Sequence, residues 1–386
     1  MNDYQNNLYN DLMALCKDSK TFYFADVQCD VSSAWFRIFN YRMAGYMEFQ
    51  APSGLECRGH MFQISEEGDD AKMIRLAALP MEKFFNLNEN PATMDLDLST
   101  VNMIEDKADG SLISSYFVNV DGEFGMPETL VRMKSKGSLS SDQAQAAMRY
   151  LMKPENLEYA HQLRTYTILH YTVNLEWCAP DNRIVLGYEE PELRVLNIRN
   201  NMTGEYVDKE DVNEMYTEIH NHWTERVETD DPVAFVASIP AMTKIEGYVV
   251  RLDSGQRVKI KTEWYIALHR TKDNINSPRR LFEACIEEAT DDMKSLFHDD
   301  PLAIKTIEEM EVFAAEKYNT LADSVTEYYK ANKELDRKEY AIKGKEELTP
   351  MQFGLAMSMY LGRDPDFKAA CKKAWKFYGL TDGDEE

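Results

Sequence analysis

The sequence predicts an α+β protein in which a domain built on antiparallel sheet is followed by an all-α domain. Up to about residue 270, short apolar runs alternate with period two and are rich in β-branched and aromatic residues, the pattern of strands. Beyond residue 272 the apolar spacing becomes helical. We therefore expect two domains, residues 1–272 and 273–386, and the chain is long enough for a core in each.

Local patterns predict the elements of the first domain. Strands are expected where β-branched and aromatic residues alternate with polar ones, at residues 100–106, 111–120, 165–177 and 191–198. The clearest hairpin joins GYVVRL to QRVKIKT through Asp253-Ser254-Gly255. Helices are expected at residues 141–152 and 208–223. A few helices among many strands indicate an α+β domain.

Helix starts in the second domain share one signature, in which a capping side chain is followed by proline. Proline suits the first helical position because its missing N–H has no partner there anyway. The four pairs are Ser277-Pro278, Asp300-Pro301, Thr349-Pro350 and Asp364-Pro365. They predict four helices, and so an all-helical domain.

The composition excludes several classes of protein. The 43 Lys and Arg residues and 67 Asp and Glu residues give a formal net charge of −24, which is wrong for a histone-like neutraliser of phosphate. No apolar run approaches the roughly 20 residues of a membrane span, and the first residues lack a signal-peptide pattern. Six scattered cysteines without a CxxC pair indicate reduced thiols. We expect a cytoplasmic protein without a membrane partner.

The motif that indicates chemistry is Lys107-Ala108-Asp109-Gly110, which lies between two expected strands. The phosphate-binding patterns GxGxxG and GxxxxGK[ST] are absent, as are GxSxG and HExxH. Alone, KxDG is weak evidence, because four such residues usually form a polar turn between strands. Further cationic and acidic motifs along the chain change this judgement.

These motifs together closely resemble those of the T4 RNA ligase 1 family of covalent nucleotidyltransferases. The resemblance is strong to about residue 300 and thinner in the helical region. It lies in ECRG at residues 56–59, PMEKFFN at 80–86, KADG at 107–110, KSKGS at 134–138, LEW at 175–177, APDNRIV at 179–185, IEGYV at 245–249 and KIKTEWY at 259–265. Ala108 and Leu175 depart from the usual family residues, but neither removes a charge. The resemblance implies a nucleotidyltransferase fold for the first domain.

The residues themselves agree with this chemistry. Lys259 and Lys261 are two apart on an expected strand, so both ammonium groups should project from one face. Such pairs are usually solvent-exposed. Here, however, the surrounding run is rich in cations within an acidic chain, which indicates an anion-binding wall. The cations are Arg251, Arg257, Lys259, Lys261, Arg270 and Lys272.

Lys107 is the expected nucleophile. Its amine must be neutral to attack the α-phosphorus of ATP, yet a lysine in water has a pKa near about 10.4, and reaching neutrality costs on the order of 4 kcal/mol. Partial burial, Lys259, Lys261 and a bound Mg²⁺ would all favour the neutral amine. The same cations would stabilise charge building on the phosphate.

The resemblance implies roles for further residues. Glu176 would contact the ribose, and Glu246 would hold a metal hydration shell, although ordinary strand carboxylates are the alternative. Tyr41, Arg58 and Lys83 match family positions that bind the β- and γ-phosphates, and Lys136 and Tyr265 match essential family positions. Asp291 would bind a divalent ion, Mg²⁺ or Mn²⁺, although Asp291-Asp292 could equally be a solvated helix face. For Tyr41 a half-buried structural aromatic is almost as good an explanation.

We therefore expect an ATP-dependent RNA ligase that joins 5′-phosphate and 3′-hydroxyl ends through lysyl-AMP and RNA-adenylate. By resemblance, its partner is nicked tRNA in the cytoplasm of a phage-infected cell, with the helical domain contacting the tRNA and no obligate protein partner. The alternatives are a non-catalytic protein that binds RNA ends, or a DNA ligase or capping enzyme. The last two normally carry an OB-fold after KxK, whereas helices are expected here.

Overall fold

The computed structural model describes residues 2–17, 19–121, 126–182, 186–268, 277–298 and 300–381. The chain divides into two compact units. The first comprises Met1–Leu87 and Asp95–Leu268, and the second comprises Asn88–Met94 and His269–Glu386. The predicted domain boundary, between residues 272 and 273, lies outside the described residues.

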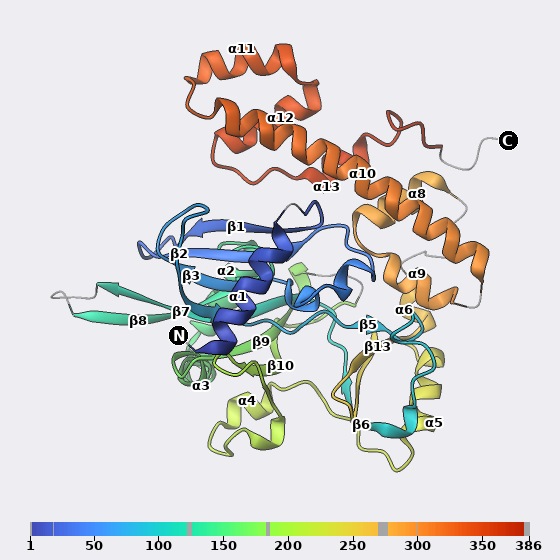
Figure 1. Cartoon of the computed structure of the whole chain (residues 1–386). Coiled ribbons are helices and arrows are strands. Elements are labelled where there is room, and N and C mark those ends of the chain that lie inside the picture. Colours follow the sequence, from blue (N-terminus) through green and yellow to red (C-terminus); the bar gives the residue numbers. More distant parts are fainter. Residues whose placement is uncertain are drawn as a thin grey trace. The chain divides into compact units, whose positions relative to one another are not determined.

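The first unit contains three sheets (Figure 1). The first has the order β1 (Phe22–Gln28), β2 (Trp35–Tyr41), β3 (His60–Ile64), β4 (Met73–Ala78). The second has the order β11 (Tyr206–Val207), β10 (Glu192–Asn200), β9 (Tyr171–Cys178), β7 (Ser111–Asp121), β8 (Pro127–Ser135). The third has the order β5 (Phe85–Asn86), β13 (Arg257–Lys261), β12 (Gly247–Leu252), β6 (Val101–Asp106). Among the described strands only β5 and β13 pair in parallel, so the predicted antiparallel α+β class is confirmed.

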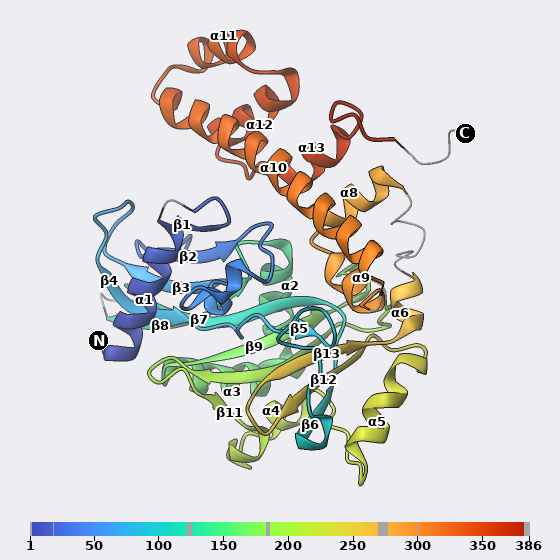
Figure 2. The ribbon, with the colours of Figure 1, turned by 45° about the vertical axis from the view of Figure 1, so that its right-hand side comes forward.

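Helices and sheets of this unit form layers. Its helices are α1 (Asp3–Cys16), α2 (Asp142–Leu151), α3 (Leu157–Ile168), α4 (Thr217–Asn221), α5 (Pro232–Ser238) and α6 (Glu263–Leu268). Helix α1 packs on one face of the first sheet, whose other face packs on β7 through Phe36, Ile38 and Tyr116. Helices α2 and α3 cover the opposite face of the second sheet (Figure 2). The alternating apolar residues of these strands thus fill three separate cores.

The third sheet has one apolar face and one polar face. Ile104, Val250, Val258 and Ile260 form a buried cluster with residues of and around α5. The residues that alternate with them point to the opposite face, because successive strand side chains alternate. Glu105, Val249 and Lys259 lie side by side there, since Val249 pairs with both Glu105 and Lys259. This polar face forms part of the candidate site.

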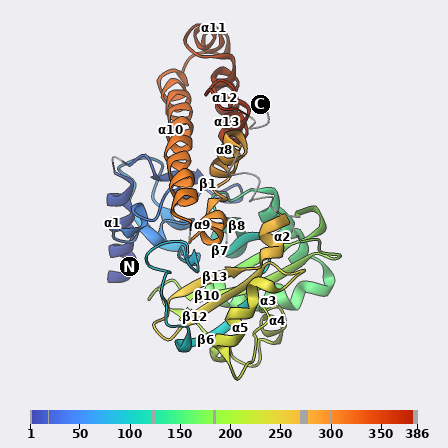
Figure 3. The same ribbon diagram turned by 90° about the vertical axis from the view of Figure 1, so that its right-hand side faces the viewer.

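The second unit is helical, as predicted (Figure 3). Its helices are α8 (Pro278–Ile286), α9 (Thr290–Leu296), α10 (Pro301–Asn332), α11 (Arg337–Glu347), α12 (Pro350–Tyr360) and α13 (Phe367–Lys373). Ser277, Asp300 and Thr349 cap α8, α10 and α12 through their side chains. The prediction for Asp364-Pro365 is wrong, because Asp366 provides the cap of α13.

Two predictions in the first unit also need correction. Residues 165–168 end α3, and the strand begins at Tyr171 after a reversal at His170, which has φ 65°. Within residues 208–223, the α-helical part is only Thr217–Asn221.

None of the described helices is long and apolar enough to cross a membrane. The six cysteines are free thiols, as expected.

Candidate active site

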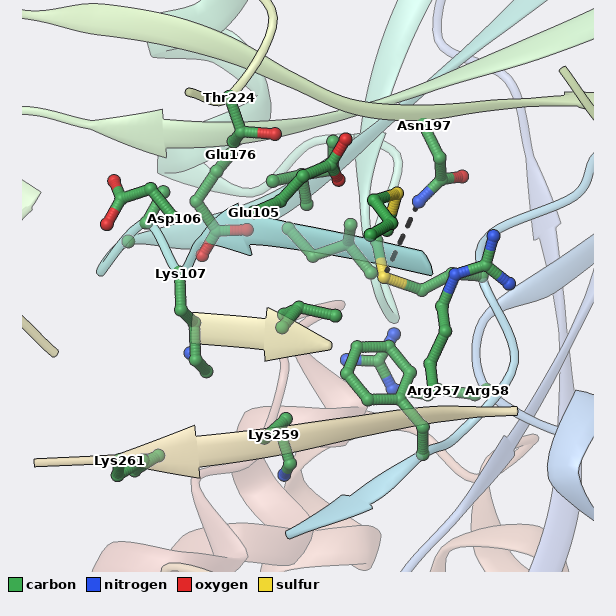
Figure 4. Close-up of a pocket in the computed structure, with 18 residues that line it drawn as sticks. Arg58, Glu105, Asp106, Lys107, Glu176, Asn197, Thr224, Arg257, Lys259 and Lys261 are labelled. Carbon is green, nitrogen blue, oxygen red and sulfur yellow. Dashed lines mark hydrogen bonds between the residues drawn. The ribbon is translucent and has the colours of Figure 1, made fainter. Parts of the chain in front are cut away.

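A cavity of about 300 Å³ lies against the polar face of the third sheet (Figure 4). The second sheet supplies another wall, and Arg58, Met81 and Phe84 line the cavity from loops. Charged residues lining it include five of the predicted site residues, Arg58, Lys107, Glu176, Lys259 and Lys261. Its apolar lining includes Met81, Phe84, Met103, Leu196 and Val249. A hollow with an apolar floor and many cations suits a nucleotide, which has a flat base and an anionic phosphate chain.

Strand β13 supplies three of the cations. Arg257, Lys259 and Lys261 are two residues apart and all line the cavity. Val258 and Ile260, which alternate with them, are buried in the cluster on the other face of the sheet. The prediction that both lysines project from one face is confirmed, and Arg257 extends the row.

Backbone contacts place the KADG turn beside two other strands. The N–H of Lys107 donates to the carbonyl oxygen of Gly247 at 3.0 Å. A Cβ on Gly110 would lie 2.3 Å from the carbonyl oxygen of Trp177, so only glycine permits this approach to β9. The turn therefore brings Lys107 close to both Glu246 and Glu176.

Glu246 forms the centre of a charged group. Its side chain is buried, and its Oε1 lies 2.7 Å from Lys107 Nζ and 3.1 Å from Lys261 Nζ. Its Oε2 is buried and has no hydrogen-bond partner among the described residues. A buried carboxylate oxygen in this condition fits a hard divalent cation or one of its water ligands.

This geometry changes one expectation about Lys107. The charged contact that the structure shows for its amine is the Glu246 carboxylate, where the sequence predicted cations. The reason is the hydrogen bond from the N–H of Lys107 to the carbonyl oxygen of Gly247, which holds Lys107 next to Glu246, the residue before Gly247. An amine held in this ion pair must give up a proton before it can act as a nucleophile.

Glu176 faces the cavity from β9 and is only partly accessible, so it is not the outward surface carboxylate of the alternative interpretation. Burial raises the pKa of Glu176 to about 7, nearby Lys107 lowers this pKa, and Glu246 raises it. Near neutral pH the side chain can therefore exist in either form. A carboxyl group so placed can hydrogen-bond a sugar hydroxyl in both forms.

Arg58 lies on the side of the view away from Lys107 and Lys261, together with Arg257 (Figure 4). Its Nη1 is buried and lacks a hydrogen-bond partner among the described residues. Nearby Lys134 is fully buried and donates to the carbonyl oxygens of Gly59 at 2.9 Å and Lys136 at 3.4 Å. Burial lowers the pKa of Lys134 to about 7, with further lowering by Lys136 and Arg58. This concentration of positive charge suits an anion.

Three predicted site residues, the phosphate-binding Tyr41 and Lys83 and the essential Lys136, are not part of the cavity lining. Lys136 Nζ lies 3.9 Å from the ring centre of Tyr41, and the Tyr41 ring packs edge-on against Phe49. Lys83 Nζ lies 5.2 Å from the ring centre of Phe85. Because Phe49 also packs on Phe85, the three residues belong to one aromatic and cationic group beside the first sheet.

Tyr265, on α6, contacts the KADG turn and is buried. Its hydroxyl donates to Oδ1 of Asp109 at 2.9 Å, and Oδ2 of Asp109 accepts from the N–H of Leu186 at 2.7 Å. The ring centre of Tyr265 also lies 5.0 Å from Lys261 Nζ. It is therefore placed to hold the nucleophile turn and the KIK strand together.

Asp291 lies in the first turn of α9, in the second unit. Burial lowers the pKa of Lys294, but Glu311 and, more weakly, Asp291 raise this pKa above its usual value. The described residues contain no group of three or more His, Cys, Asp or Glu side chains able to hold a metal. Metal binding by Asp291 stays a prediction. Predicted motif residues 183–185, and Arg270 and Lys272, lie outside the described residues.

Four polar residues of the lining were not selected from the sequence: Glu105, Asp106, Asn197 and Thr224. Glu105 and Asp106 directly precede Lys107, so their place at a strand end was an available signal. Asn197 and Thr224 have no such signal, because only the pairing of distant segments brings them to the cavity.

Comparison with known proteins decides the family. The model of the RNA ligase family matches residues 56–265, and the model of the T4 RNA ligase 1 C-terminal domain matches residues 272–376. The chain belongs to the T4 RNA ligase 1 family. It is accordingly an ATP-dependent RNA ligase, and the predicted enzyme class is confirmed.

Two relatives found by sequence agree with this assignment. A Thermovibrio ammonificans protein predicted to be an RNA ligase is 25% identical over 332 residues, covering 81% of this chain and 82% of its own. RNA ligase 1 of bacteriophage TS2126 is 28% identical over 254 residues, covering 64% of this chain and 59% of its own. A solved archaeal ATP-dependent RNA ligase is 11% identical, with 96% of each chain covered and a TM-score of 0.45.

Proposed function

We propose that this T4 RNA ligase 1 family member seals 5′-phosphate and 3′-hydroxyl RNA ends through lysyl-AMP and RNA-adenylate, and that broken tRNA is its natural substrate. The observation that carries the proposal is the position of Lys107 in the cavity, with its amine 2.7 Å from Glu246 and with Lys259 and Lys261 on the facing strand. A protein that only binds RNA ends would need no such amine.

In the first step, the Lys107 nitrogen attacks the α-phosphorus of ATP. A nitrogen–phosphorus bond forms, the bond from that phosphorus to the bridging oxygen breaks, and pyrophosphate leaves. The amine must lose a proton, and Oε1 of Glu246 is near enough to accept it. Lys259 and Lys261 would stabilise the charge that builds on the α-phosphate.

A divalent metal such as Mg²⁺ would add charge neutralisation at the α-phosphate when bound. Glu246 is the residue placed to hold it or its waters, because its Oε2 is buried without a partner in the described structure. From the family resemblance, we propose that Asp291, in the second unit, binds a divalent ion. Arg58, with Tyr41, Lys83 and Lys136 nearby, would bind the two outer phosphates.

In the second step, an oxygen of the RNA 5′-phosphate attacks the same phosphorus, and Lys107 leaves as the free amine. In the third, the 3′-hydroxyl attacks the 5′-phosphorus, and AMP leaves. Glu176 would orient the adenosine through its ribose throughout. Tyr265 would support the KADG turn during each transfer.

We assign residues 273–386 to recognition of the tRNA body, because the C-terminal domain of T4 RNA ligase 1 matches residues 272–376. Sealing would then take place in the cytoplasm of a phage-infected cell. End recognition should rest on phosphates and 2′-hydroxyls, since folded RNA offers few readable base edges.

The central prediction concerns the covalent intermediate. Wild-type protein incubated with α-labelled ATP and Mg²⁺ or Mn²⁺ should acquire one labelled AMP, and mass spectrometry should place it on Lys107. The Lys107→Ala variant should remain unlabelled because the proposed nucleophile is removed. Lys72→Ala, which removes an exposed lysine, should label normally. Wild-type protein that never becomes labelled would refute the proposed function.

A further inference from the structure

Arg199, on β10, is a buried arginine outside the cavity lining, and its side chain is 4% exposed. Its Nη1 and Nη2 donate to the two carboxylate oxygens of Glu56 at 2.8 and 2.9 Å. Nη1 also donates to the carbonyl oxygen of Pro80 at 2.8 Å. Nε and Nη2 donate to the carbonyl oxygen of Gly204 at 3.1 and 2.9 Å. One guanidinium thus joins three segments of the first unit.

Two of these segments carry cations of the site. Glu56 is two residues before Arg58, and Pro80 is three residues before Lys83. The N–H of Lys83 donates to the carbonyl oxygen of Leu55 at 2.8 Å, so the two segments are also bonded to each other. A displacement of either segment would therefore move both cations.

The third segment, which contains Gly204, is followed by Tyr206, whose ring contacts both Arg199 and the cavity residue Arg257. The Arg199 guanidinium lies 4.7 Å from the ring centre of Tyr206, and that of Arg257 lies 3.9 Å from the same ring. The Tyr206 hydroxyl accepts a hydrogen bond from the N–H of Glu82 at 3.4 Å. This bond connects Tyr206 to the segment that follows Pro80. Arg199 and its neighbours thus support Arg58, Lys83 and Arg257.

Charge gives Arg199 a second effect. By occupying both oxygens of Glu56, it neutralises a carboxylate that is only two residues from Arg58. His60 Nε2 lies 2.8 Å from the same carboxylate. An unneutralised Glu56 would attract Arg58, whose Nη1 is otherwise buried without a partner among the described residues. A buried ion pair is a poor source of stability by itself, so a role in positioning is a better reason for its presence.

We propose that Arg199 is a positioning residue for the ATP-dependent first step, holding Arg58, Lys83 and Arg257 where they bind the pyrophosphate portion of ATP. This inference rests on the proposed function. It has a specific consequence, because pyrophosphate leaves in the first step. Arg199 should matter for reaction with ATP and much less for sealing RNA that is already adenylated.

The test compares two reactions of the full-length protein. In Arg199→Met, the KM for ATP in self-adenylation should rise roughly 10- to 100-fold, the size expected when a charged hydrogen-bonded group is lost. Sealing of preformed adenylated RNA should stay within about twofold of wild type. Arg199→Lys keeps the charge but cannot reproduce the fork, so it should give an intermediate KM.

Arg37→Met is the matched control. Arg37 is fully buried, and its bidentate bonds to Asp26 are both 2.7 Å long. It lies on β2 of the first sheet, whereas Arg199 lies on β10 of the second, and it does not line the cavity. Its loss should lower thermal stability and change the two reactions by the same factor. If Arg199→Met does not fold, Glu56→Gln serves instead, since it weakens the same bond and leaves the contacts to Pro80 and Gly204.

The outcomes separate the possible failures. Equal loss of both reactions in the folded Arg199 or Glu56 variant, or an unchanged KM for ATP, would overturn the positioning role. A selective rise in KM for ATP would support it. If wild-type protein forms no lysyl-AMP in the same assay, the proposed function itself fails, whatever the variants do.

Discussion

Glu176 and Lys134 are buried ionisable groups whose pKa values converge from opposite directions. Burial raises the pKa of Glu176 from 4.5 to about 7 and lowers the pKa of Lys134 from 10.5 to about 7. In each case the folded protein disfavours the charged form, because burial removes water from the charge. Stability near neutral pH should therefore contain two opposing contributions.

The signs of the two contributions follow from proton linkage. Folded Glu176 holds its proton more tightly than the unfolded chain does, so its contribution to stability is present at low pH and is lost as the pH rises through about 7. Folded Lys134 loses its proton more readily, so its unfavourable burial is relieved as the pH rises from about 7 toward 10.5. Between pH 6 and 8 the two changes nearly cancel.

Single variants should separate the two contributions to the pH dependence of the free energy of unfolding. Relative to wild type, the free energy of unfolding of Glu176→Gln should rise by about 1 kcal/mol between pH 6 and 8, and that of Lys134→Met should fall by about 1 kcal/mol. Urea unfolding at pH 6, 7 and 8 measures both, and the comparison with wild type removes groups common to all three proteins. Parallel curves would show that these two residues do not titrate differently in the folded state.

At the scale of elements, the pairing of β12 with β13 fixes the cationic row. Gly247 pairs with Lys261 and has φ 153°, and a Cβ there would lie 1.9 Å from the carbonyl oxygen of Ile260. The same residue follows Glu246 and accepts the bond from Lys107. Both the strand pair and the charged group around Lys107 therefore depend on this glycine.

Gly247→Ala should thus lower the free energy of unfolding by about 3 kcal/mol and sharply reduce lysyl-AMP formation, because the strands must separate to admit the methyl group. Gly255→Ala is the control in the hairpin turn. Its φ is 84°, but no atom lies within 4 Å of an added Cβ, so it should cost only about 1–2 kcal/mol of backbone strain and leave labelling intact. Chemical unfolding and AMP labelling measure the two effects, and equal loss in both variants would contradict this account.

Local patterns predicted some elements well and others poorly. The β12–β13 hairpin and the capped starts of α8, α10 and α12 were predicted because turn and cap residues act through neighbouring backbone groups. The strand prediction for residues 165–168 was wrong because a short apolar alternation fits the end of a helix as well as a strand. The helix start predicted at Asp364 was wrong because Asp366, two residues later, can make the same capping hydrogen bond.

At the scale of the whole molecule, the cavity residues all belong to the first unit. Chemistry and tRNA choice should therefore be separable. A chain ending at residue 276 should still form lysyl-AMP but lose its preference for nicked tRNA over a short nicked hairpin by about tenfold or more, equivalent to about 1.4 kcal/mol. Ratios of kcat/KM for the two substrates measure this.

The corresponding control is circular dichroism of the shortened chain, which should retain its strand signal. A folded chain that keeps full tRNA preference would place recognition in the first unit. A folded chain that cannot form lysyl-AMP would show that the helical unit contributes to the first step.

The sequence by itself determined the fold class and the family and drew attention to the KADG motif, because strand alternation, helix caps and the order of charged motifs depend on local residue types. It also predicted that Lys259 and Lys261 share one face, which follows from strand geometry alone.

Only the tertiary structure decided how these motifs meet. The Lys107–Glu246 contact, the Arg199 bonds to Glu56 and Pro80, and the places of Asn197 and Thr224 join residues that are far apart along the chain. Such contacts depend on strand register and sheet packing, and no local pattern encodes the distance between two charges on different strands.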